Sequence, residues 1–222
     1  MSRNLTSLIG SWTNQSPTHI GQIIIFRHHS PPHTVELRHA DDASLSPDSL
    51  TTHTHPESAR DLSFTDQAGE YRPLKTAPTL RRGWRMLLDT DEHLRIALDH
   101  FYPAMTAIYA SHLDHTLIPV ALRDTLGRQT GMYAATKRLT ESESHVLVCT
   151  ACNDTNCLKK VLWTLDGNSE FLGLPEDQRV PQPEPSRIPL LCHEACNILV
   201  ASAREVVKKR ERAAAALESA SS

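Results

Sequence analysis

Two short runs of β-branched and aliphatic residues stand out in the first forty positions. Residues 21–27 (GQIIIFR) and 34–38 (TVELR) are typical of strands. Pro31 and Pro32 lie between them and exclude a two-residue hairpin turn. Residues 41–58 are rich in Asp, Ser, Thr, His and Pro, which predicts a long loop. This part of the chain therefore predicts a small β-containing domain.

Beyond the first 88 residues the spacing of apolar positions becomes helical. Leu94 and Leu98 begin a series with the i, i+3/i+4, i+7 pattern of an amphipathic helix. Asp89 or Thr90 can cap its start. Pro103 is expected to kink this helix or to split it in two, because proline lacks a backbone N–H.

The C-terminal half mixes strand and helix patterns. Residues 145–148 (HVLV) and 161–165 (VLWTL) predict two buried strands, and a weaker helix is expected around 119–129. From Cys192 to about Ala215 the pattern predicts a long helix.

The change of pattern near Gly83 predicts a domain boundary. We expect an α+β protein with two domains. The first is a small β-rich domain over residues 1–83. The second, over residues 84–222, is an α/β domain that ends in the long helix.

Composition limits the classes of function. The 222 residues carry a net charge of −3 with histidine neutral. The sequence contains no stripe of basic residues of the kind that binds nucleic acid. The sequence contains no run of 18 apolar residues, so we expect no membrane span. We also expect no leader peptide, because the N-terminus lacks that pattern. We therefore expect a cytoplasmic protein, in which clustered cysteines indicate metal ligands or redox groups rather than disulfides.

The five cysteines form the clearest chemical pattern in the chain. They are Cys149, Cys152, Cys157, Cys192 and Cys196. If the long helix starts near Cys192, the last two thiols project from one face of its first turn, where the helix dipole favours thiolates. The spacing alone leaves open a disulfide framework, a structural zinc site and an iron–sulfur cluster.

Five thiols exceed the four positions that a zinc ion or a [4Fe–4S] cluster offers. With the other three cysteines fixed, either Cys149 or Cys152 is left over. Cys149 ends the predicted strand and can point into the core as a small hydrophobic side chain. Cys152 lies in a polar loop and can adjust to a metal. We therefore favour Cys152, with Cys149 as the alternative.

Six segments that cover most of the chain resemble, in order, a known accessory region. They are GQIIIFRHHSPPHTVELRHADD, GEYRPLKTAPTLRRGW, ALDHFYPAM, LRDTLGRQTGMYAATKRL, CLKKVLWTLDG and LCHEACNILVASAREVV. This region is similar to the C-terminal part of iron–sulfur-containing sirohydrochlorin cobaltochelatases, a small stabilising domain followed by a [4Fe–4S]-binding domain. Cys157 with Trp163, and the segment from Cys192 to Cys196, stand at the family's motif positions. His193 replaces a proline that is common there.

The resemblance implies a [4Fe–4S] cluster and a redox role. It implies electron transfer beside tetrapyrrole metal chelation in a cobalamin-type pathway, with a sirohydrochlorin-type chelatase or a redox protein as partner. The chelatase half is not part of the similarity, so it does not predict an enzyme on its own. The alternative is a non-redox interaction module in which zinc or a cluster only stabilises the fold.

Overall fold

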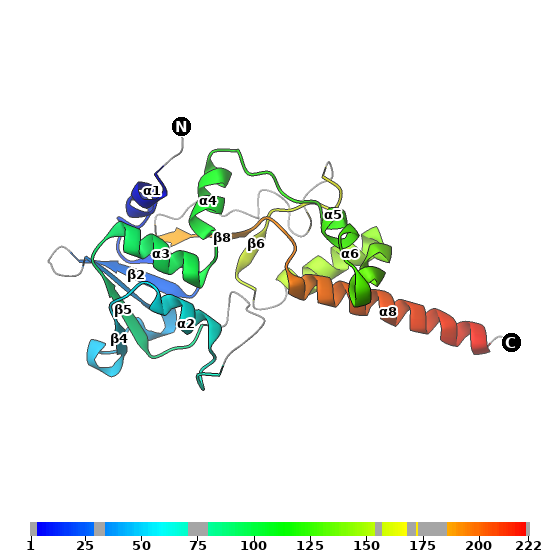
Figure 1. Cartoon of the computed structure of the whole chain (residues 1–222), viewed down its shortest axis with the longest axis horizontal. Coiled ribbons are helices and arrows are strands. Elements are labelled where there is room, and N and C mark those ends of the chain that lie inside the picture. Colours follow the sequence, from blue (N-terminus) through cyan, green and yellow to red (C-terminus); the bar gives the residue numbers. More distant parts are fainter. Residues whose placement is uncertain are drawn as a thin grey trace. The chain divides into compact units, whose positions relative to one another are not determined.

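The computed structural model of the chain describes residues 4–28, 34–70, 80–153, 157–167, 172 and 186–220. Its contacts divide the chain into two compact units (Figure 1). The first comprises Met1–Leu117 and Val180–Leu191, and the second comprises Ile118–Arg179 and Cys192–Ser222. Helices and a mixed sheet are both present, so the predicted α+β class with two domains is confirmed.

A mixed sheet forms the centre of the first unit. In spatial order its described strands are β4 (Thr51–His53), β5 (Trp84–Leu88), β3 (Val35–His39), β2 (Ile23–Arg27), β1 (Thr18–Ile20) and β7 (Arg187–Ile188). The inner neighbours pair antiparallel, whereas β4 and β7 run parallel to the strands beside them. The two strands predicted from β-branched runs are β2 and β3, and both predictions are confirmed.

Helices pack on this sheet and on one another. They are α1 (Leu5–Trp12), α2 (Ser58–Phe64), α3 (Asp91–Phe101) and α4 (Met105–Leu113), with short 3₁₀ turns η1 (Ala40–Asp42) and η2 (Pro47–Ser49). Helix α3 lies across the sheet in Figure 1, and Phe101 stacks on Trp84 of β5 with ring centroids 5.1 Å apart. Thr90 caps α3 by accepting a hydrogen bond from the His93 amide. The helical segment is split in two around Pro103, as the sequence predicts: α3 ends before this proline and α4 begins after it.

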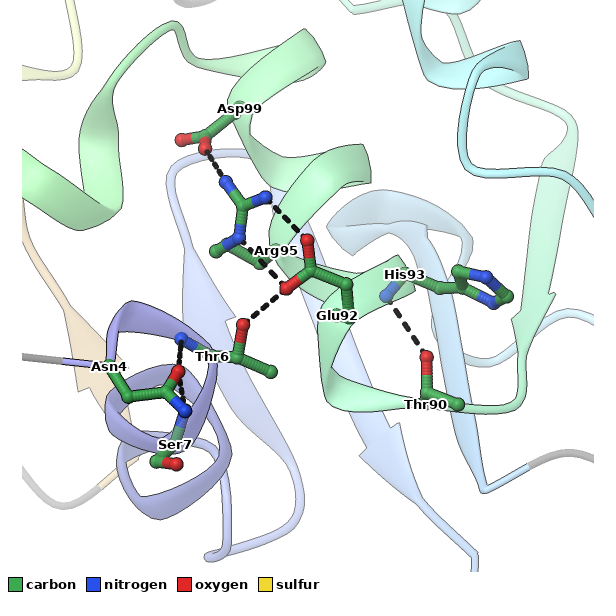
Figure 2. A network of polar contacts seen from close by, with 8 residues as sticks. All are labelled: Asn4, Thr6, Ser7, Thr90, Glu92, His93, Arg95 and Asp99. Atoms are coloured by element: carbon green, nitrogen blue, oxygen red, sulfur yellow. Dashed lines mark hydrogen bonds and ion pairs between the residues drawn. The ribbon is translucent and has the colours of Figure 1, made fainter.

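A polar network joins the starts of α1 and α3 (Figure 2). Arg95 contacts Glu92 and Asp99 on its own helix, at 2.6 and 3.0 Å. The Thr6 hydroxyl donates to Glu92 across the two helices, and Asn4 caps α1. These contacts fix how α1 lies on α3.

The boundary between the units differs from the position expected near Gly83. Residues 84–88 form a strand, not the entry to a helix, and that strand pairs with β3 and β4 of the first unit. Trp84, Met86 and Leu88 are buried in alternation with half-exposed neighbours, which is the period of a strand. The chain leaves the first unit at Leu117 and returns to add β7 beside β1.

The second unit is mainly helical. Its described elements are α5 (Leu122–Gly127), the 3₁₀ segment η3 (Gly131–Arg138), α6 (Glu141–Val148), the π turn η4 (Cys149–Asn153), β6 (Lys159–Val161) and α8 (Asn197–Ala220). Strand β8 (Leu190–Cys192) leads the chain into it. Helix α8 packs against η3, α6 and η4. None of the helices within the described ranges is long and apolar enough to cross a membrane.

The predicted strand over residues 145–148 is wrong, because these residues end helix α6. Thr140 and Glu143 form a capping box that starts this helix four residues upstream of the apolar run. A short run of apolar residues fits either a strand or a buried helical turn, so the cap decides between them. Leu147 and Val148 join the core of the second unit.

Candidate iron–sulfur site

Three segments of the second unit carry the cysteines. Cys149 and Cys152 lie in the π turn that follows α6, and Cys157 precedes β6. Such π turns are frequent at functional sites in proteins. Cys192 ends β8, and Cys196 comes directly before α8. None of the five forms a disulfide.

The expectation that Cys192 and Cys196 share the first turn of a helix is wrong. The Cys192 carbonyl accepts a hydrogen bond of 2.7 Å from the Leu162 amide, which holds Cys192 in extended backbone. The Cys196 carbonyl accepts the first helical hydrogen bond, from Val200 at 3.1 Å. Cys196 therefore lies at the N-terminus of α8, near its unpaired amides, while Cys192 lies on the preceding strand.

Cys152 lies among the other four thiols. Burial raises the pKa of Cys152 to about 12, and the charges of the nearby thiols add to this shift. Among these thiols, that of Cys157 raises this pKa most, followed by those of Cys192, Cys196 and Cys149. All five cysteines that the sequence singles out therefore lie in the second unit, near enough to Cys152 for their charges to act on its thiol.

The thiols are gathered, but they do not stand as a preformed metal site. Within the described ranges, no three Cys, His, Asp or Glu side chains are placed so that they could hold a metal ion. Cys149 and Cys196 are exposed, whereas Cys152, Cys157 and Cys192 are half-buried. Which four are ligands therefore stays a prediction.

Cys192 has the most detailed surroundings of the five. Burial raises the pKa of its thiol, while the indole of Trp163 and the ammonium of Lys159 act in the opposite direction. The thiol donates a hydrogen bond of 3.1 Å to the carbonyl of Glu194. Both Cys152 and Cys192 pack against the apolar core of the second unit.

Backbone and ionic contacts hold the loop between Cys192 and Cys196. The His193 carbonyl accepts a hydrogen bond of 3.1 Å from the Val120 amide. Arg128 pairs with Glu194 at 3.0 Å between Nη2 and Oε1. Val120, just before α5, and Arg128, just after it, therefore contact the loop that carries two thiols.

The side chains present fit an anionic iron–sulfur cluster. Thiolate ligands and cations such as Lys159 suit a cluster whose net charge is negative. Nε1 of Trp163 is buried without a hydrogen-bond partner of ordinary geometry, so a donor next to Cys192 is available. In the sequence, Trp163 stands with Cys157 at the motif positions of the similar family, but nothing there indicates that its indole lies next to Cys192.

The fold and the gathered thiols define a class, an iron–sulfur-binding protein with a separate β-rich domain. Comparison with known families agrees. Residues 9–113 match the DR2241 stabilising domain, and residues 114–205 match the 4Fe-4S iron-sulfur cluster binding domain. The chain thus combines these two domains, which confirms both the predicted resemblance and the predicted [4Fe–4S] cofactor. The limit between the matches, at 113/114, lies close to the division between the two units.

One solved structure shares this arrangement over nearly the whole chain. The crystal structure of DR2241 from Deinococcus radiodurans superposes with a TM-score of 0.71 and 28% sequence identity. The match covers 92% of this chain and 41% of that chain, so this chain spans less than half the length of its relative. DR2241 is described as a multi-domain protein with structural similarity to chelatases and with two additional novel domains. No protein with a curated description matches the chain.

Proposed function

We propose that this protein is a redox accessory of a tetrapyrrole metal chelatase, and that its [4Fe–4S] cluster is ligated by four cysteines. The proposed ligands are Cys152, Cys157, Cys192 and Cys196. The observation that carries the proposal is that Cys152 is half-buried and packs against the core of the second unit, within the residues that match the 4Fe-4S cluster binding domain.

The link to chelation is supported by the relative with chelatase-like structure. DR2241 contains a region similar to this chain together with structural similarity to chelatases. We infer that this protein works beside a sirohydrochlorin-type chelatase in cobalamin biosynthesis. A cytoplasmic location fits this role, because five cysteines without a disulfide suit a reducing compartment.

The residues of the second unit would perform separate tasks at such a cluster. The cluster itself supplies one-electron transfer when it is bound. Cys152 and Cys192, which pack against the apolar core, would hold it, and the core would limit access of water to these two ligands. The Arg128–Glu194 pair keeps the loop of Cys192 and Cys196 in place.

Anaerobic purification tests the cofactor and its redox role. We expect a brown protein with about four irons and four sulfides per chain, and a reversible one-electron signal by electron paramagnetic resonance (EPR). A colourless protein with one zinc would instead support a non-redox module in which the metal only stabilises the fold.

The chelatase role needs an assay of its own. Insertion of Co²⁺ into sirohydrochlorin by a separate chelatase is measured with this protein in its oxidised form, in its reduced form and absent. We expect the rate to depend on the redox state of the cluster. Equal rates in all three conditions would contradict the accessory role while leaving the cluster assignment untouched.

A further inference from the structure

Trp163 is buried directly beside the proposed ligand Cys192. Its side chain is 1% exposed and belongs to the apolar core of the second unit, against which Cys192 also packs. The neighbouring residue, Leu162, donates its amide to the Cys192 carbonyl at 2.7 Å. The backbone therefore holds Trp163 next to the strand that carries this cysteine.

The indole N–H of Trp163 has no ordinary partner among the described residues. A tryptophan N–H is only a donor, and a buried donor without an acceptor is unfavourable. Trp84 shows the usual arrangement in the same chain, since its Nε1 donates to the Arg81 carbonyl at 2.7 Å. The unpaired N–H of Trp163 therefore indicates that its acceptor becomes available only when a cluster is bound at the site.

The sulfur of Cys192 is the group that can complete this contact. In the structure its thiol is a donor to the Glu194 carbonyl. An iron-bound Cys192 has lost that proton, so its sulfur can only accept hydrogen bonds.

We propose that Trp163 is a positioning residue of the cluster, whose indole N–H donates a hydrogen bond to the sulfur of Cys192. This inference rests on the proposed function, in which Cys192 is a ligand. A donor to a cluster sulfur stabilises the more negative, reduced form. Trp163 therefore raises the reduction potential of the cluster and orients one of its four ligands.

Replacement of the indole by a phenyl ring removes the donor and keeps an aromatic side chain. For Trp163→Phe we expect about a fivefold lower ratio of reduced to oxidised cluster at a fixed applied potential, which corresponds to about 40 mV for a one-electron couple. The potential is measured by EPR-monitored redox titration of the anaerobically purified protein. The matched control is Trp84→Phe, which loses a buried indole in the first unit and should leave the potential unchanged.

A second measurement uses the unmodified protein, in case Trp163→Phe fails to retain iron. Tryptophan labelled with ¹⁵N in the indole ring is incorporated, and the reduced cluster is studied by pulsed EPR. A hyperfine coupling to one indole nitrogen is expected. Its absence, or an unchanged potential in an iron-replete Trp163→Phe protein, would overturn the inference. Absence of iron and sulfide from the unmodified protein would instead overturn the proposed function.

Discussion

At the scale of single residues, the site depends on how each thiol is held. Cys152 is half-buried, packs on the core and lies among the other four thiols. Cys149 is exposed at the end of α6. These positions support Cys149 as the thiol that is left over.

Two alanine variants test this assignment. We expect Cys149→Ala to keep about four irons per chain, since Cys152 and three further thiols remain as ligands. Cys152→Ala should lose most of its iron, because the exposed Cys149 cannot replace the half-buried sulfur without movement of the π turn. Iron and sulfide analysis after anaerobic purification measures both. The reverse pattern would make Cys149 the ligand.

At the scale of elements, the contact between α1 and α3 has a charge at its centre. Hydrogen bonds from Arg95 and from the Thr6 hydroxyl lower the pKa of Glu92 to about 2 from its ordinary value of 4.5. A carboxylate with a lowered pKa in the folded state stabilises it above pH 4.5, and this contribution is lost as the pH falls toward 2. Figure 2 shows Glu92 between the two partners.

The stability of the Glu92→Gln variant should therefore depend less on pH than that of the unmodified protein. At pH 7 we expect its first unit to melt about 1–3 °C lower, since the pair is exposed and screened by solvent. This difference should shrink as the pH falls from 5 to 2. Tryptophan fluorescence against temperature measures it. Glu57→Gln, at the exposed start of α2, controls for the loss of one negative charge. A difference that persists at pH 2 would contradict the assignment.

Elements with local signals were predictable from the sequence, and elements fixed by distant contacts were not. Strands β2 and β3 carry β-branched runs, and α3 carries both its cap and its apolar face. Strand β7 has two described residues and exists through pairing with β1, far away in the sequence. The cysteines of the site are visible in the sequence. The extended backbone at Cys192 is not, because the Leu162 amide imposes it.

At the scale of the whole molecule, each unit has a core of its own. The first is built on the sheet and helices α1 to α4, with Trp84 and Phe101 at its centre. The second is a smaller cluster of mostly aliphatic side chains around Trp163, with Cys152 and Cys192 packed at its edge. We expect binding of the cluster at that edge to contribute to the folding of the second unit, because ordering the thiols and ordering the core are coupled.

Removal of the cluster should therefore destabilise the second unit selectively. After oxidation and chelation of the iron, we expect the thermal transition of the second unit to fall by at least ~10 °C, while that of the first unit stays within ~2 °C. Circular dichroism follows the whole chain. Fluorescence of Trp163→Phe follows the first unit alone, because the remaining tryptophans, Trp12 and Trp84, both lie there. If both transitions shifted together by a similar amount, the two units would unfold as one cooperative body, and the cluster would stabilise the whole chain rather than its C-terminal part.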